Sequence, residues 1–153
     1  MTKPPRRKSR RTSISNQDQP FSACRSTVVK LLAKNGIDLN RHVITSRDKS
    51  AKALNKSLSI KSAPQGFTKS RLPFFMECEG VNFYISSAAP GVRVGAHSHE
   101  HGPVVRFILE GSITFRDTEY STGDWIYLPE GAKYSFEVGS RGASFILLYC
   151  CCC

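Results

Sequence analysis

The second half of the chain carries a regular β pattern that restricts its fold more than any other feature. From residue 73 onward, short runs of β-forming residues alternate with breaks that contain glycine or proline. Successive side chains of a strand point to opposite sides, so one set can be buried while the other meets solvent. Seven or eight short strands at even spacing predict an all-β barrel or jelly roll. The runs cover residues 81–87, 92–99, 106–109, 112–116, 119–121, 125–128, 134–138 and 143–149.

Charge divides the 153-residue chain into two unequal parts. Residues 1–72 hold seventeen Lys and Arg against three acidic residues, a net charge of +14. Residues 73–153 hold five against nine, a net charge of −4. Residues 1–20 have too few apolar side chains to offset the entropy of folding, so we expect a disordered basic tail there. Nucleic-acid contact is not favoured, because the tail has neither interleaved aromatic residues nor a helix-turn-helix pattern.

Residues 21–72 are predicted to form a partly helical extension and linker in front of a barrel domain at residues 73–153. Apolar residues recur at helical spacing in the segment 21–40, where Gly36 supplies a stop signal. Residues 41–72 are rich in Lys and Ser, and we expect a mobile connector with one weak helical turn. The expected fold class is therefore all-β, a β-barrel or jelly roll with a disordered or weakly helical basic N-terminal extension.

Six cysteines are present, at positions 24 and 78 and in the terminal run 150–153. Adjacent cysteines cannot staple a fold as separated ones do, so no disulfide framework is predicted. The terminal run fits an inert or redox-labile end better than a prenylation box, while other lipidation and a soft-metal site stay open. No apolar run reaches the length of a membrane span, and no signal-peptide core follows the charged start. A cytoplasmic location is the default expectation, although the Arg- and Ser-rich start also matches the composition of a transit peptide.

Three of the four histidines stand at alternate positions, His97, His99 and His101. In an extended strand, residues two apart share one face, and imidazole is the commonest protein ligand for transition metals. These residues therefore predict a metal site if a barrel brings their rings together. A turn signal at Gly102-Pro103 leaves open that His101 swings free. The alternative is an exposed histidine-rich loop that binds no metal.

Residues 91–138 resemble the two sequence motifs of the cupin superfamily, a family of small β-barrels. The first motif has a glycine, five residues, a His-x-His pair, a glutamate and a closing glycine. The second has a glycine, five residues, Pro-x-Gly, a histidine and an asparagine. The resemblance covers the predicted barrel domain and implies a cupin-type barrel. The residues that match are Gly91, His97, His99 and Gly111 for the first motif, and Gly123, Pro129 and Gly131 for the second.

Two of the usual cupin ligands are replaced in this chain. The motif glutamate falls at Val104, or at Pro103 on the shorter spacing, and the second-motif histidine falls at Tyr134. The resemblance therefore implies His97 and His99 as metal ligands. His101 is a third candidate ligand, because it lies two residues further along and would share their face of an extended strand. Tyr134 is expected close to them, where its phenol can ligate iron, hydrogen-bond a bound water or act as a catalytic proton donor. Simple packing of its ring is the alternative.

The resemblance implies a metal-binding small cupin, with oxygenase-, isomerase- or decarboxylase-type chemistry on a small organic acid or enol as one outcome. The cofactor would be a divalent transition metal, either Fe, Ni, Cu or Zn. The alternative is a non-enzymatic ligand-binding or regulatory cupin whose basic N-terminal segment contacts nucleic acid or a partner. A homodimer is expected on the same resemblance, and no membrane partner.

Side-chain parity also suggests walls for a cavity. An aromatic lining with a cation at its rim would suit an aromatic or unsaturated carboxylate. Aromatic residues of strands are, however, more often core, and Arg93 and Arg106 are expected at the surface. The residues available to line the interior are Phe107, Phe115, Trp125, Tyr127 and Phe136.

Overall fold

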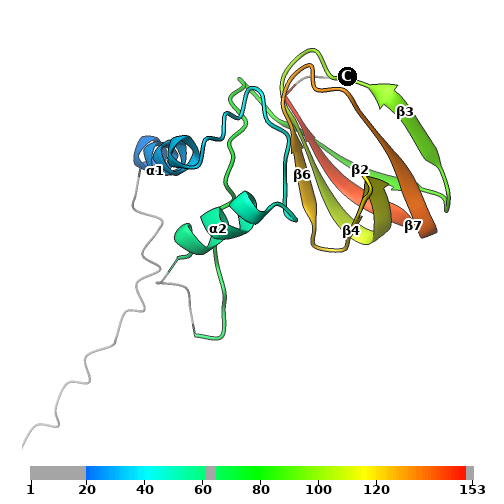
Figure 1. Ribbon diagram of the computed structural model, residues 1–153, viewed down its shortest axis with the longest axis horizontal. Helices are drawn as coiled ribbons and strands as arrows, with labels where there is room; N and C mark the ends of the chain where they lie inside the picture. The colour runs from blue at the N-terminus through cyan, green and yellow to red at the C-terminus, as the bar shows by residue number, and fades with distance from the viewer. Residues whose placement is uncertain (1–19, 61–64, 151–153) are drawn as a thin grey trace, which may run out of the picture.

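The computed structural model describes residues 20–60 and 65–150 of the chain. Two helices and a seven-stranded antiparallel sheet form this part (Figure 1). The predicted basic tail falls almost entirely outside the described residues, and that prediction stays open. The elements are α1 (Phe21–Lys34), β1 (Ile44–Thr45), α2 (Lys49–Ser57), β2 (Asn82–Ala88), β3 (Arg93–His97), β4 (Val104–Phe115), β5 (Thr118–Ser121), β6 (Trp125–Leu128) and β7 (Tyr134–Tyr149).

The strands pair in the order β1-β6-β4-β7-β2, with β3 added to β7 and β5 added to β4. The two longest strands exchange partners along their length. β4 pairs first with β6 and then with β5, and β7 pairs first with β3 and then with β2. The ribbon shows the sheet curled, with β3 and β6 on opposite sides of β7 and β4 (Figure 1). The predicted all-β fold class, with helices confined to the N-terminal extension, is confirmed.

The two long strands bend where they cross. Their register shifts between Ile108 and Glu110 and again between Gly111 and Ile113. Gly111 has a φ of 70°, and a Cβ there would lie 1.9 Å from the carbonyl oxygen of Gly142. Only glycine fits such a close crossing of two backbones. The two runs predicted as separate strands around Gly111 are therefore one bent strand, β4.

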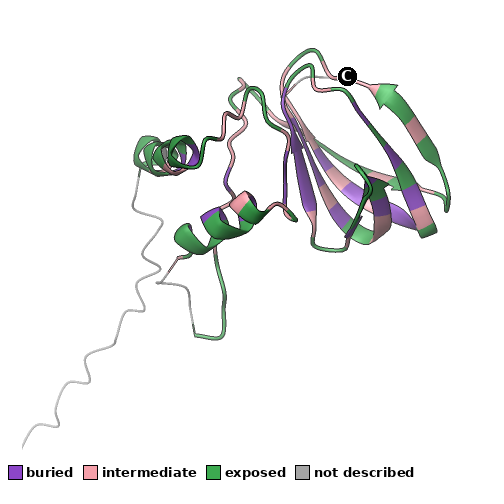
Figure 2. Cartoon of the chain, in the orientation of Figure 1, coloured by how far each residue is buried: buried purple, intermediate pink, exposed green. Residues whose placement is uncertain are grey.

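Two apolar clusters lie on opposite faces of the sheet. The outer cluster joins Val105, Trp125 and Tyr127 of the sheet to residues of both helices, among them Leu32 and Leu54. Burial of side chains this large contributes about 1.5–3 kcal/mol each, so the outer cluster holds the extension on the sheet. Figure 2 shows buried positions on β6 and on both helices. The inner cluster consists of Val104, Ile108, Ile113, Phe115, Tyr120, Ile126, Leu128, Tyr134, Phe136, Val138, Ala143, Phe145 and Leu147.

The segment predicted as a mobile connector contains β1 and α2, so that prediction is wrong for residues 44–57. α2 buries Ala51 and Leu54 against the outer cluster, and Leu58 follows directly after the helix. Three apolar residues among Lys and Ser indicate a helix only weakly. The stability of α2 comes from packing against the outer cluster, which composition does not reveal. The helix predicted in the segment 21–40 is confirmed as α1, and Gly36 follows it with a φ of 67°.

Asp124, in the turn before β6, ties the segment after β1 to the sheet. Its carboxylate accepts hydrogen bonds from the Ser46 hydroxyl at 2.7 Å, the Arg47 guanidinium at 2.6 and 2.9 Å, and the Ser121 amide at 2.9 Å. Burial raises the pKa of Asp124, but the bonds from Ser121, Ser46 and Arg47 outweigh it. The pKa of Asp124 therefore lies below its ordinary value of 3.8.

We expect Asp124→Asn to lower the free energy of unfolding at neutral pH by about 1–2 kcal/mol, because charge-assisted hydrogen bonds weaken and solvent partly screens Arg47. With a lowered folded-state pKa, this contribution is complete above pH 3.8 and is lost as the pH falls through the folded-state value. Urea unfolding at neutral pH and at about pH 3 measures the change, with Asp117→Asn in the exposed β4–β5 turn as control. An equal loss of unfolding free energy at both pH values would contradict a stabilising role of the ionised Asp124 carboxylate.

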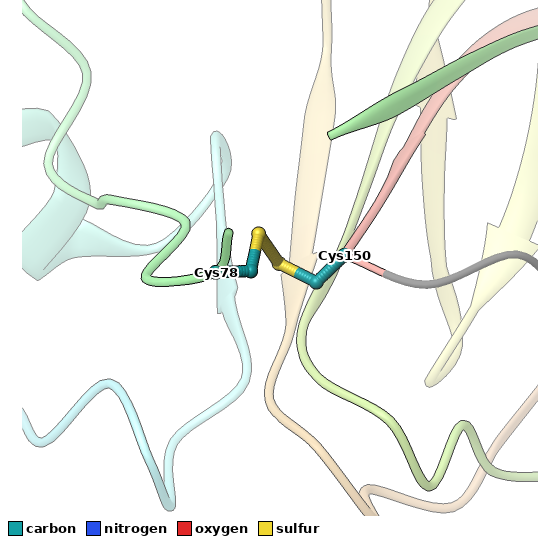
Figure 3. The surroundings of a disulfide bond; sticks show 2 residues. All are labelled: Cys78 and Cys150. Atoms are coloured by element: carbon teal, nitrogen blue, oxygen red, sulfur yellow. A yellow bond between two sulfur atoms is a disulfide. The ribbon is translucent and has the colours of Figure 1, made fainter. Parts of the chain in front are cut away.

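A disulfide joins Cys78 to Cys150, which corrects the expectation of no disulfide (Figure 3). The two Cα atoms are 5.6 Å apart, whereas the residues are 72 positions apart in sequence. The bridge connects the segment before β2 to the end of β7, and residues 151–153 of the cysteine run lie outside the described residues. Disulfides persist mainly in oxidising compartments, and the cytoplasmic location stays a prediction. Within residues 20–60 and 65–150, no helix has the length and apolar character that crossing a bilayer requires.

Candidate functional site

Two of the three predicted histidines meet Tyr134 where β3 ends and β7 begins. His97 and Tyr134 are direct partners in the β3–β7 register. The Nε2 atom of His97 lies 2.8 Å from the Tyr134 phenol oxygen, and the Nε2 atom of His99 lies 3.0 Å from the same oxygen. The Gly131 amide also donates to the His99 carbonyl at 2.8 Å, so the predicted Pro-x-Gly turn braces the histidine loop. Three side chains from two segments therefore converge on one point.

The hydrogen bonds determine where the protons lie in this group. The Nδ1 atom of His97 is 2.8 Å from the Gly95 carbonyl oxygen, and a carbonyl can only accept, so Nδ1 carries the hydrogen. In the tautomer with its hydrogen on Nδ1, the Nε2 atom of His97 accepts a bond from the Tyr134 hydroxyl. Because that hydroxyl has one hydrogen, its oxygen must accept from Nε2–H of His99. This assignment follows from the network and gives the two imidazoles opposite tautomers.

Arg106 lies beneath Tyr134 inside the sheet, and the expectation that it is a surface residue is wrong. It is 6% exposed, its Nη2 atom lies 3.5 Å from the Tyr134 oxygen, and its guanidinium stacks over Phe136 and Phe145 at 4.6 and 4.8 Å. Among the described residues, none of the ion pairs includes Arg106. Burial, the neighbouring His97 and then Arg106 lower the pKa of His99, which keeps that ring neutral. The alternation of Arg106 with two buried residues of β4 was a sequence signal for its inward direction.

His101 lies apart from this group. It lines a cavity of about 760 Å³ between α1 and the sheet, together with Glu77, Glu100 and Glu130. Gly102 has a φ of 120° and turns the chain directly after His101, so the alternation does not extend to that residue. In the described part of the chain, no three His, Cys, Asp or Glu side chains group as metal ligands. The metal role of the three histidines stays a prediction, and the donors that meet are two imidazoles and one phenol.

The predicted cavity walls divide between the two faces of the sheet. Phe115 and Phe136 lie in the inner cluster, whereas Phe107, Trp125 and Tyr127 pack in the outer cluster against the extension. Burial, followed by the charges of Glu77 and Asp38, raises the pKa of Tyr127 to about 12, so this phenol stays protonated. The predicted aromatic lining is therefore wrong for three of its five members.

A second cavity, of about 630 Å³, adjoins the histidine group, because Tyr134 also belongs to its lining. Phe115 and Phe136 contribute apolar walls, and Arg116 and Lys133 are basic residues of its lining. Arg93 also belongs to the lining, is exposed as expected and pairs with Glu137 at 3.1 Å. Asp117 and Glu137 belong to the same lining, so its charge is mixed, with three basic residues against two acidic ones.

No protein-family model and no curated protein sequence matches this chain. Solved structures to which the chain is similar include proteins described as cupins. A cupin protein from Bacteroides fragilis is 25% identical over 45% of this chain and 64% of its own length, just under two thirds, with a TM-score of 0.40. A cupin-2 domain containing protein from Shewanella frigidimarina is 18% identical over 48% of this chain and 72% of its own, with a TM-score of 0.39.

A predicted oxalate decarboxylase from Thermotoga maritima is 21% identical over 69% of this chain and 77% of its own, with a TM-score of 0.39. At such scores these similarities describe the fold alone, and the chemistry of the site has to come from the residues of this chain.

Proposed function

We propose that this chain binds a divalent transition metal through the Nε2 atoms of His97 and His99 and the phenol oxygen of Tyr134. The observation that carries the proposal is the approach of both Nε2 atoms to within 3.0 Å of one oxygen. Imidazole nitrogen and phenol oxygen suit iron, copper, nickel or zinc. Metal-ligating histidines also usually donate their other N–H to a carbonyl or carboxylate, as His97 does to Gly95. The donor set therefore fits a metal that leaves coordination positions open.

The proposed ligand beside the metal is a small organic acid or enol. A bound metal would act as a Lewis acid toward it. The cavity that Tyr134 helps to line also holds two phenylalanines, three basic residues and two acidic ones, and its basic side chains and rings would orient a small anion by charge and stacking. Arg106 adds a buried positive charge behind Tyr134. Oxygenase- or isomerase-type chemistry is the activity that we propose to test for this group.

A second candidate function is anion binding without a metal, by a non-enzymatic or regulatory protein. Arg106 favours it, because a buried guanidinium without an ion-pair partner among the described residues attracts an anion. The same charge opposes a metal ion. Two unit charges about 4 Å apart repel by about 4 kcal/mol at an effective dielectric constant of about 20, and less where solvent enters. Metal and anion binding are therefore separable by experiment.

Metal analysis of the purified full-length chain tests the main proposal. We expect about one equivalent of metal after reconstitution, and a melting temperature that falls on chelation, because a ligand at 100 times its dissociation constant stabilises the folded state by about 2.7 kcal/mol. A chain that takes up no metal and melts at the same temperature with and without chelator would rule out the metal. Binding of an organic anion to that metal-free chain would then support the second candidate.

Replacement of Arg106 by Met separates the two functions further. Methionine keeps apolar volume against Phe136 and Phe145 but removes the charge. We expect metal affinity to rise about tenfold, because a nearby positive charge is lost, and affinity for a small carboxylate to fall about as much. Isothermal titration with Zn(II) and with a carboxylate measures both. A fall in metal affinity instead would show that Arg106 supports the metal site, against this account.

A further inference from the structure

The cavity of about 760 Å³ beside α1 lies between the sheet and the N-terminal extension, which the cupin resemblance does not cover. Arg25 and Val29 of α1 stand four residues apart, so they share the side of the helix that lines it. β6 supplies Tyr127, and the Cys78–Cys150 bridge belongs to the same lining (Figure 3). Small-molecule sites commonly measure about 300–1,000 Å³, so this cavity has the size of a ligand site. We name it the extension cavity.

The walls of the extension cavity combine aliphatic side chains with two aromatic rings. Val29, Leu32 and Leu39 are aliphatic members of the lining, and Phe75 and Tyr127 contribute the rings. The Tyr127 hydroxyl donates to the Leu39 carbonyl oxygen at 3.2 Å, so the polar end of this ring is satisfied within the protein. Aromatic faces attract ammonium groups that lie within about 6 Å of the ring centre. The walls therefore suit a ligand with an apolar body, and their rings favour a positive charge on it.

Carboxylates outnumber basic groups in the lining. Four of the twelve acidic residues of the chain line the extension cavity, against one basic residue, Arg25. Arg25 donates twice to the Glu77 carboxylate, and Arg41 pairs with Asp38 at 3.5 Å, so two of the four carboxylates have a basic partner. Burial, and then the charges of Glu77 and Asp38, raise the pKa of Tyr127 to about 12. The negative field of the lining thus reaches the cavity wall.

The other two carboxylates belong to Glu100 and Glu130, which line the cavity from two loops of the barrel. The Gly131 amide donates to the His99 carbonyl oxygen at 2.8 Å, and this bond joins the two loops. Of the ion pairs that the described residues form, none includes either glutamate, and both residues are exposed. Because the whole chain carries a net charge of +10, these carboxylates make the cavity mouth a local exception that attracts a cation.

We propose that the extension cavity binds a small organic cation, an ammonium group carried on an apolar or aromatic body. Glu100 and Glu130 pair with the ammonium group, and the aliphatic side chains and rings beside α1 pack against the body. A carboxylate ligand would meet like charge at the mouth, and a neutral ligand would leave both glutamates unpaired. The lining shares no residue with the histidine group or with the cavity beside it, so this proposal does not depend on the proposed metal.

Isothermal titration of the full-length chain with 2-phenylethylammonium at about pH 7 tests the proposal, with 2-phenylethanol as the uncharged analogue of the same shape. We expect a dissociation constant on the order of 100 μM for the cation, and one at least about tenfold higher for the alcohol. Because both glutamates are exposed, the affinity for the cation should fall as salt rises from about 0.02 to about 0.5 M. No binding of the cation up to about 10 mM, or equal binding of the alcohol, would overturn the proposal.

A larger side chain at Val29 tests where the cation binds. Val29→Trp should raise its dissociation constant at least about tenfold, because the indole takes up space that the ligand needs. Val92→Trp is the matched control, since Val92 is 39% exposed against 41% for Val29 and lines neither cavity. Circular dichroism verifies the fold of both variants. Unchanged affinity in Val29→Trp, or an equal loss in Val92→Trp, would refute binding in the extension cavity.

Substitution of the two glutamates tests the choice of charge. Glu100→Gln combined with Glu130→Gln should raise the dissociation constant of the cation about fivefold, because exposed ion pairs are individually weak, and should leave that of the alcohol unchanged. Glu119→Gln is the control, since Glu119 is an exposed glutamate of β5 outside the cavity. If the double variant binds the cation as tightly as the wild type does, the carboxylates do not select the ligand and a cation site is wrong.

Discussion

Replacement of His97 or His99 by alanine is expected to lower the affinity for a divalent transition metal by about 100-fold or more. Each imidazole supplies one of the three proposed donors, because the two Nε2 atoms lie 2.8 and 3.0 Å from the third donor, the Tyr134 oxygen. Loss of even a supporting group around a metal commonly costs about 10–100-fold, and loss of a ligand costs more. Titration against a chelating competitor measures the change.

His101→Ala is the matched control for these variants, because it is the same substitution two residues from His99. It should leave metal affinity unchanged, since His101 lines the other cavity. If His101→Ala loses as much affinity as His97→Ala, the alternating three-histidine set predicted from the sequence holds the metal. That outcome would contradict a site that is completed by Tyr134.

Removal of the disulfide is expected to have the largest effect on stability. Cys78→Ser should lower the free energy of unfolding by about 4 kcal/mol, because a bridge between residues 72 positions apart restricts a long loop of the unfolded chain. Urea unfolding of the oxidised wild type and the variant measures the difference. Gly102 lies against the bridge, since a Cβ there would come within 2.7 Å of the Cys150 Cβ. We therefore expect the loop that carries His99 and His101 to exchange its amide hydrogens faster in the variant.

Cys24→Ser is the control for this experiment, because Cys24 is a described cysteine that takes no part in the disulfide. It should change stability far less than Cys78→Ser does. Reduction of the wild type should reproduce the loss seen in Cys78→Ser. Equal unfolding curves for oxidised wild type, reduced wild type and Cys78→Ser would show that the bridge does not stabilise the fold.

The fold class could be predicted because burial on one face leaves a period of two in the sequence. The course of β4 could not be predicted. Gly111 was interpreted as a turn between two strands, whereas the structure has one strand that bends at this residue. α2 was missed because its helix forms on the outer cluster rather than by its own propensity. The bridge between Cys78 and Cys150 was missed because sequence does not state which distant thiols meet.

The sequence predicted part of the candidate site. The spacing of His97 and His99 predicted that they share a direction, and the second motif predicted Tyr134 beside them, as their hydrogen bonds have it. Their part in metal binding stays a prediction. Strand alternation puts Arg106 on the same face as Val104 and Ile108, which are buried. It was expected at the surface because arginine side chains are seldom fully buried. His101 departed from the pattern because the strand ends at His97 and Gly102 turns the chain.

An X-ray absorption spectrum of the metal-loaded full-length chain, recorded for the wild type and for Tyr134→Phe, tests the central claim most directly. We predict scattering from two imidazoles and a phenol oxygen in the wild type, and from the same two imidazoles without that oxygen in Tyr134→Phe. A spectrum with three imidazoles, with none, or with no change in Tyr134→Phe would contradict the proposed site.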